Sequence, residues 1–168
     1  SSTIKLDVIR VDQPLLKELY KEVQVKYPTL GPIETDMEKM FAYVQYYFPK
    51  FKTPRVITLI NEVDTEAKSF YVDTLALVSL DCYLGKNHRF YVDFPEYKKE
   101  ELEANQIVPN LVSSFCYGKI ATPTDRTLLS AMIYFGKEQY LKDLLLPNVE
   151  DFDKMGYSKE QQIWCEEN

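Results

Sequence analysis

The spacing of apolar residues in the first part of the chain predicts one strand followed by two helices. Apolar side chains alternate with other residues from position 4 to position 8, which is typical of a strand with one buried face. From Pro14 to Tyr27 they recur at helical spacing, and Pro28 ends this run. A second helical run over residues 37–48 follows Thr35 and Glu38, which have the spacing of a capping box.

Short apolar runs in the middle of the chain predict further strands. The β-branched run over residues 56–60 is typical of a buried strand, and residues 70–72 and 75–80 follow the same pattern. Asp73 and Thr74, between the last two runs, favour a tight turn or a bulge. Together with residues 4–8, these runs predict a sheet of about four strands.

The second half of the chain has helical spacing throughout. Proline residues suit the first turn of a helix, so Pro95 and Pro109 predict helices through Leu102 and Cys116. Thr124 is the expected cap of a long helix that Pro147 ends, and residues 158–161 form a second capping box before a last helix. The order of elements predicts a single α+β domain over residues 1–168, mainly helical and packed on a small sheet.

Composition and charge exclude several classes of function. The chain has 168 residues, 45% apolar and 27% charged, which is typical of a globular domain. Its net charge is −6, and lysines and arginines are scattered among acids, which argues against nucleic acid and against an anionic membrane surface. The densest charge run, residues 98–101, is typical of a solvated helix face.

The residues that usually bind metals or act as nucleophiles are few. The single histidine, His88, lies between Lys86 and Arg89, and cationic neighbours disfavour a bound cation. Cys82 and Cys116 lie among apolar residues and are expected to be buried thiols. No cysteine pair has the spacing of a zinc or redox motif, so we predict no metal and no cofactor.

Carboxylates are numerous, and their positions favour structural roles. Asp73 and Asp81 flank one predicted strand, and Asp93 and Glu96 follow it, where turn-forming acids are common. A serine or cysteine nucleophile would need a positioned base, and the nucleophile elbow motif is missing. The sequence therefore predicts no catalytic residue.

Aromatic residues gather in two places and suggest a recognition surface. Tyrosine has a large contact area with a polar tip and is enriched at interfaces, although such rings also line the edges of cores. Loops on a rigid sheet are common recognition sites, so the first candidate surface follows the last predicted strand, and His88→Ala and Tyr91→Ala are expected to change partner binding more than stability. The candidate surface consists of Tyr83, His88, Arg89, Phe90, Tyr91, Phe94 and Tyr97, with a secondary cluster of Tyr43, Tyr46 and Tyr47.

Several stretches in a shared order resemble one known family. These are residues 73–97, Ile-Val-Pro-Asn at 107–110, Met-Ile-Tyr-Phe-Gly-Lys at 132–137, Leu-Leu-Leu-Pro at 144–147, and 156–161 with Trp164 and Cys165. Together they resemble the gliding-motility lipoprotein B (GldB-like) family of Bacteroidetes cell envelopes. The resemblance implies a lipoprotein held on the periplasmic side of a membrane by an acylated cysteine upstream of Ser1, with other envelope proteins as partners. It also implies a longer mature protein, of which this chain lacks the C-terminal part.

The family in turn resembles zincin-type peptidases, in which two helices carry the zinc ligands. Here the corresponding segments are residues 107–115, with Pro109, Asn110 and Ser113, and Phe135-Gly136, with phenylalanine in place of a ligand glutamate. Close packing is the expected reason for Gly136 within a helix. The resemblance therefore implies a degenerate scaffold that acts as a non-catalytic binding or assembly module in motility or secretion. The alternatives are a zinc peptidase with ligands outside this chain and a glycan-binding envelope module.

Overall fold

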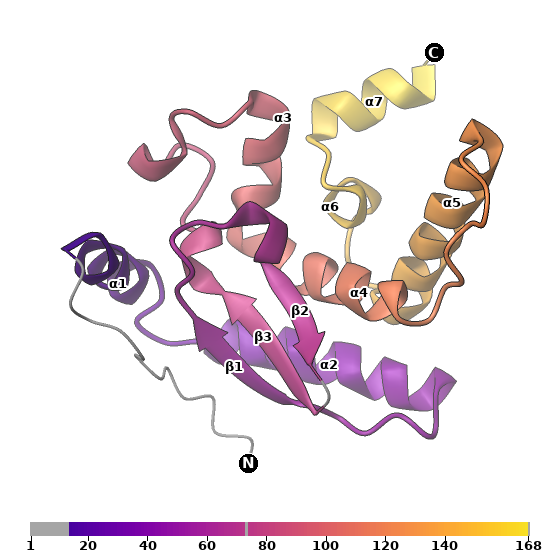
Figure 1. Ribbon diagram of the computed structural model, residues 1–168, viewed down its shortest axis with the longest axis horizontal. Helices are drawn as coiled ribbons and strands as arrows, with labels where there is room; N and C mark the ends of the chain where they lie inside the picture. Colours follow the sequence, from indigo (N-terminus) through magenta and orange to yellow (C-terminus); the bar gives the residue numbers. More distant parts are fainter. Residues whose placement is uncertain (1–13, 73, 168) are drawn as a thin grey trace.

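A mixed sheet carries the fold in the computed structural model, which describes residues 14–72 and 74–167 (Figure 1). Its strands are β1 (Arg55–Leu59), β2 (Ser69–Val72) and β3 (Leu75–Ser79), in the order β1-β3-β2. β3 pairs parallel with β1 and antiparallel with β2. The domain is thus α+β, as predicted.

The sheet has three strands among the described residues, which are three of the about four that the sequence predicts. The strands expected near residues 56–60, 70–72 and 75–80 are confirmed. The one expected at residues 4–8 lies outside the described residues, as does Asp73 of the expected turn. Val72 pairs with Leu75, so β2 and β3 form a tight hairpin.

Two helices precede the sheet, α1 (Pro14–Lys26) and α2 (Gly31–Tyr47). α1 has the predicted extent. α2 begins before the expected capping box, because its N-terminal residues Gly31 and Pro32 already belong to the first turn. The hydroxyl of Thr35 therefore donates to the carbonyl of Gly31 at 3.0 Å, inside the helix, instead of capping it.

The second half is helical, as expected, with some boundaries shifted. Short 3₁₀ turns are η1 (Thr65–Ala67), η2 (Leu80–Cys82), η3 (Arg89–Tyr91), η4 (Glu100–Leu102) and η5 (Ala104–Gln106). The α-helices are α3 (Glu96–Lys99), α4 (Ile107–Tyr117), α5 (Leu128–Leu145), α6 (Asp151–Met155) and α7 (Lys159–Glu167). Sequence patterning did not predict α6, which is shorter than two turns.

The caps of the last helices agree in part with prediction. Thr127, and not Thr124, caps α5: its hydroxyl oxygen accepts from the amide of Ser130 at 3.2 Å. The second capping box is confirmed, since the amide of Ser158 donates to Gln161 Oε1 at 2.8 Å and the amide of Gln161 donates to Ser158 Oγ at 3.3 Å.

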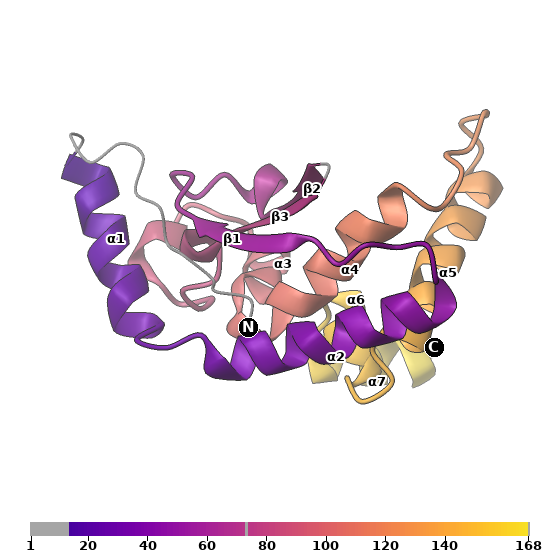
Figure 2. The ribbon, with the colours of Figure 1, turned by 90° about the horizontal axis from the view of Figure 1, so that it is seen from below.

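One hydrophobic core joins the sheet to the helices. Figure 2 shows α2 below the sheet and α4 beside it, and α4 packs on β2, α2 and α5. Burying these side chains provides most of the stability of the domain. The core includes Leu19 and Val23 of α1, Met40 and Val44 of α2, Ala76 and Val78 of β3, and Leu111, Val112 and Phe115 of α4.

Candidate functional site

Two residues of the predicted recognition surface belong to the core, which corrects the prediction for them. Tyr83 and Tyr91 have no exposed surface. The hydroxyl of Tyr91 donates to the carbonyl of Asp81 at 2.5 Å and accepts from the amide of Leu84 at 3.0 Å. The hydroxyl of Tyr27 donates to the carbonyl of Tyr83. These rings cannot contact a partner, because the turn after β3 folds back and covers them.

His88 and Arg89 of the same surface hold helix α1. Arg89 Nη2 lies 2.6 Å from both Glu18 Oε1 and Glu22 Oε1, and His88 Nε2 lies 3.6 Å from Glu22 Oε2. The hydrogen bond from Arg89 lowers the pKa of Glu22. Arg89 also lies over the ring of Phe90 at 4.8 Å. This part of the predicted surface therefore links α1 to the loop that follows β3 through ion pairs.

Among the remaining predicted residues, exposure varies. Phe94 is half-buried against the core, and Tyr97 is 66% exposed. Tyr43, Tyr46 and Tyr47 are exposed on α2, and Tyr43 lines a groove of about 330 Å³ between α2 and the end of α5. Their exposure is clear, whereas their role in binding stays a prediction.

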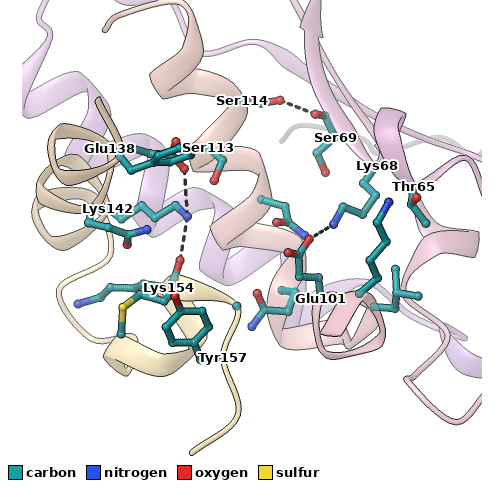
Figure 3. Close-up of a pocket in the computed structure, with 18 of the residues that line it drawn as sticks. Thr65, Lys68, Ser69, Glu101, Ser113, Ser114, Glu138, Lys142, Lys154 and Tyr157 are labelled. Carbon is teal, nitrogen blue, oxygen red and sulfur yellow. Dashed lines mark hydrogen bonds and ion pairs between the residues drawn. The ribbon is translucent and has the colours of Figure 1, made fainter. Parts of the chain in front are cut away.

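A larger cleft, of about 700 Å³, lies between the β2 side of the sheet and the C-terminal helices (Figure 3). Its lining combines the segments that the zincin resemblance singled out, with Asn110 and Ser113 from α4 and Phe135 and Gly136 from α5. Within residues 14–72 and 74–167, no group of three or more His, Cys, Asp or Glu side chains could hold a metal ion. The expected close packing at Gly136 is wrong, since a Cβ there would meet nothing within 4 Å.

Neutral hydrogen bonds organise the side of the cleft formed by β2 and α4. The hydroxyl of Tyr83 lies 3.1 Å from Ser69 Oγ and accepts from Asn110 Nδ2 at 3.2 Å. Ser114 Oγ donates to the carbonyl of Ser69, and Ser113 Oγ donates to the carbonyl of Pro109 at 3.3 Å. Tyr83, predicted as a surface residue, thus positions Asn110 and Ser69 from the core side of the cleft.

Ion pairs organise the opposite side (Figure 3). Lys142 Nζ lies 3.2 Å from Glu138 Oε1 and donates to the carbonyl of Lys154 at 2.8 Å. Lys154 Nζ lies 3.0 Å from Asp143 Oδ1 on α5 and also pairs with Asp151. Lys142 and Lys154 are both buried, and a buried ammonium group requires acceptors. The contacts above supply acceptors for both. These reciprocal contacts fix α6 against α5.

The sequence reasoning missed most of the charged residues of the cleft. Lys68 pairs with Glu101, a member of the charge run expected to be a solvated helix face. Glu138 and Lys142 had a detectable signal, since their i, i+4 spacing favours a salt bridge on one helix face. The packing of distant segments decides which ion pairs face a cleft. The spacing of residues in the sequence does not contain this information.

The nucleophilic groups near the core are held in their neutral forms. Burial raises the pKa of the Cys116 thiol to about 12 and raises that of Cys82 further. Burial also raises the pKa of the Tyr83 hydroxyl above its usual range. A thiolate is the reactive form of cysteine, so neither buried thiol is activated at neutral pH.

Asp81 has a structural role, in agreement with the sequence interpretation. Its carboxylate accepts from the amides of Asn61 at 3.2 Å and Val63 at 2.8 Å. Glu62 and Val63 have φ values of 59° and 60°, a conformation that costs energy for residues other than glycine. Asp81 therefore holds a strained turn, which leads directly into η1 and one wall of the cleft.

Helix α5 exposes several large apolar residues. In Figure 2 the first turns of this helix stand apart from the sheet and α2. The sequence of α5 contains more apolar residues than one buried helix face requires. This excess is the signal from which an exposed apolar face could have been predicted. We call the exposed set the outer face of α5; it consists of Leu128 (76% exposed), Leu129 (66%), Met132 (62%), Ile133 (49%) and Tyr140 (64%).

A known protein family matches nearly the whole chain. The model of a family described as "Gliding motility protein GldB" matches residues 2–168. Searches of curated proteins and of solved structures found no match. Across the part of the chain that the structure describes, the helices lack the length and apolar character needed to cross a membrane.

Proposed function

The chain belongs to the GldB gliding-motility family, and on that premise we propose that it is a non-catalytic module of a cell-envelope lipoprotein. In this proposal it serves motility or secretion by binding another envelope protein through the outer face of α5. The family match over residues 2–168 supports the envelope setting. The periplasmic location and the lipid anchor are part of the proposal, and they follow from the lipoprotein character of the family.

The chemistry of the cleft supports a non-catalytic role. Asn110 and Ser113 of α4 and Phe135 of α5 occupy the segments that would carry zinc ligands in a zincin-type peptidase. Asparagine and serine are weak zinc ligands, and phenylalanine cannot coordinate a metal. The two buried thiols are neutral at physiological pH, which argues against a cysteine nucleophile. We therefore interpret the scaffold as a degenerate metallopeptidase.

The outer face of α5 carries the proposal. Leu129, Ile133 and Tyr140 follow the i, i+4, i+11 spacing by which one helix face meets a partner, and Leu128 and Met132 extend it on one side. A contiguous exposed apolar surface of this kind marks an interaction site more often than a solvent face.

Charges beside the outer face indicate the chemistry of the partner. Arg126 precedes α5 and Lys137 lies within it, and neither forms an ion pair with any residue in the described ranges. Complementary charges steer association and fix register at interfaces. We propose that the partner presents an amphipathic helix whose apolar stripe is bordered by acidic residues.

Site-specific cross-linking tests this function. A photo-reactive amino acid replaces Ile133 in the full-length protein, cells are irradiated, and the cross-linked peptides are sequenced. We expect cross-links to an amphipathic, acid-bordered helix of another envelope protein. Cross-links only to lipid, to a second copy, or to another part of the same polypeptide would contradict the proposal. The same amino acid at Lys21, exposed on α1 at the opposite end of the molecule, is the control (Figure 1).

A further inference from the structure

The cleft of Figure 3 has a lining that suits an uncharged, hydroxyl-rich ligand. We propose that it binds a segment of a neutral saccharide chain. Its volume of about 700 Å³ falls within the usual range of ligand sites, roughly 300–1,000 Å³. No residue of the outer face of α5 lines this cleft, so the inference goes beyond the proposed function.

The first observation concerns the charged groups of the cleft. Every charged residue that lines it is already in an ion pair: Lys68 with Glu101, Lys98 with Glu66, Lys142 with Glu138, and Lys154 with Asp143 and Asp151. A charged ligand would have to compete with these internal partners, and breaking the pair of Lys142 with Glu138 is the most costly because both side chains are largely buried. A neutral ligand leaves all of them intact.

The second observation is an amide side chain in the cleft lining that forms no hydrogen bond within the described part of the chain. Gln106 is 3% exposed and lines the cleft, and its amide group makes no hydrogen bond to any residue in the described part of the chain. An amide carries two N–H donors and one acceptor oxygen, and none of these is used within the described part of the chain. Gln106 can therefore both donate to and accept from ligand hydroxyls.

Further neutral groups surround this amide. Asn110 donates one hydrogen bond to Tyr83, which leaves its second N–H and its carbonyl oxygen for a ligand. Ser113 donates to the carbonyl of Pro109, which leaves its oxygen as an acceptor. Mixed donors and acceptors without net charge match a saccharide, whose hydroxyls each donate and accept.

The third observation is the set of aromatic rings around the cleft. Tyr97 (66% exposed), Phe135 (60%) and Tyr157 (43%) come from α3, α5 and the segment after α6, and all three line the cleft. Aromatic rings offer flat apolar faces with a negative quadrupole, on which the C–H face of a sugar ring can stack. Three exposed rings from distant segments give several such platforms around one polar cleft.

A peptide added as an extra strand fits less well. β2 is the edge strand beside the cleft, and pairing with it requires free backbone groups. The carbonyl of Ser69 at the start of β2 already accepts from Ser114 Oγ. The edge is therefore partly capped by α4, and this favours a ligand that binds through side chains.

Calorimetric titration with two uncharged tetrasaccharides, chitotetraose and cellotetraose, tests the inference. We expect at least one to bind, and we expect Tyr97→Ala and Tyr157→Ala each to weaken its Kd about tenfold. Gln106→Leu should abolish binding, with the melting temperature measured in parallel because this residue is buried. Tyr46→Ala, which removes an exposed ring of α2 outside the cleft, is the matched control and should bind like the wild type.

Three results would overturn the inference. They are no binding of either tetrasaccharide at concentrations up to about 10 mM, unchanged binding in both tyrosine variants, or binding of the neutral peptide tetraglycine with the same dependence on Tyr157. Ile133→Asp, on the outer face of α5, should leave saccharide binding unchanged. Failure of this inference is therefore distinguishable from failure of the proposed partner-binding function.

Discussion

At the scale of single residues, Tyr83 connects the core to the cleft. Its ring is fully buried, while its hydroxyl reaches Ser69 and Asn110 in the floor of the cleft. The neighbouring Tyr91 is equally buried, but its hydroxyl bonds only to the backbone of the turn after β3. The two tyrosines are thus both structural, but Tyr83 orients residues of the cleft and Tyr91 orders the backbone of the turn.

Tyr91 provides a direct stability test. Replacing a large buried aromatic residue with alanine leaves a cavity, so we expect Tyr91→Ala to lower the free energy of unfolding by about 3–5 kcal/mol. This replaces the sequence-based expectation that the variant affects binding more than stability. Tyr91→Phe should cost about 1–2 kcal/mol, because it leaves the amide of Leu84 without its acceptor. Urea denaturation measures both.

The control is Tyr97→Ala, because Tyr97 is 66% exposed in the same loop region. It should change stability by no more than about 0.5 kcal/mol. Similar losses for Tyr91→Ala and Tyr97→Ala would show that the burial difference between them is not real.

Asp81 makes stability depend on pH. Burial raises its pKa, and hydrogen bonds from Val63 and Asn61 oppose the shift without cancelling it. Because the folded state holds the proton more tightly, Asp81 contributes most stability below its unfolded pKa of about 3.9, and this contribution is lost as pH rises through the folded value. Relative to Asp81→Asn, the wild type should therefore lose stability as pH rises from about 4 to 7.

Urea titrations of both proteins at several pH values check this dependence. Asp125→Asn is the control, because the pKa of Asp125 is lowered by hydrogen bonds from Ser130 and Thr127 and its carboxylate is exposed. A stability difference between wild type and Asp81→Asn that stays constant over this range would refute the interpretation.

At the scale of elements, α6 is positioned by its neighbours. The crossed contacts of Lys142 and Lys154 fasten it to α5. Its C-terminal glycine, Gly156, has φ of 70° and lies against Glu101, the partner of Lys68. One short helix thus joins α5 to the side of the cleft that includes η4.

Two glycines of the cleft should respond oppositely to alanine. Gly156→Ala places a Cβ 3.2 Å from Glu101 Cγ and forces a left-handed conformation on alanine, so it should destabilise the protein by about 1–2 kcal/mol. Gly136→Ala adds a methyl group in open space within α5 and should stabilise by about 0.5–1 kcal/mol. Thermal or urea denaturation distinguishes the signs, and destabilisation by Gly136→Ala would show that the space is filled.

The outer face of α5 should tolerate a charge without unfolding. Ile133 is 49% exposed, so Ile133→Asp should cost no more than about 1 kcal/mol while weakening partner binding at least about tenfold. Cross-linking yield from a photo-reactive residue at Met132 measures the binding. Val25→Asp is the matched control, because Val25 is an apolar residue of α1 that is 79% exposed. Equal yields in both variants would contradict the proposed interface.

At the scale of the whole molecule, the proposed binding surfaces lie away from helix α1. Helix α1 lies at one end, where Arg89 pairs with it, while helices α5, α6 and α7 lie toward the other end (Figures 1 and 2). The proposed interface thus lies on α5, and the cleft lies between α5, α6 and the β2 side of the sheet.

Metal content tests the non-catalytic assignment at this scale. We expect the full-length mature protein, purified without a histidine tag, to contain well under one zinc per chain. The reason is that Asn110, Ser113 and Phe135 stand in the segments that, under the proposed likeness to zincin-type peptidases, would supply the ligands. Elemental analysis after exposure to zinc and gel filtration measures the content, and a stoichiometry near one would restore the peptidase hypothesis.

Much of the fold follows from local patterns. The α+β class, the strands near residues 56–60, 70–72 and 75–80, the helix from Pro14 and the capping box at Ser158 were all predictable, because each depends on neighbours in sequence. The caps of α2 and α5 were not, since Thr35 and Thr127 show that the backbone entering a helix decides which hydroxyl is used.

The candidate site divides in the same way. The sequence by itself determined the family resemblance, the scarcity of metal ligands and the two segments, near Asn110 and Phe135, that meet in the cleft. Only the tertiary structure decided that Tyr83 and Tyr91 are buried, that Gln106 lacks a partner for its amide, and that α5 exposes an apolar face. Spacing reports which residues share one face of an element, whereas burial and pairing depend on which distant element covers that face.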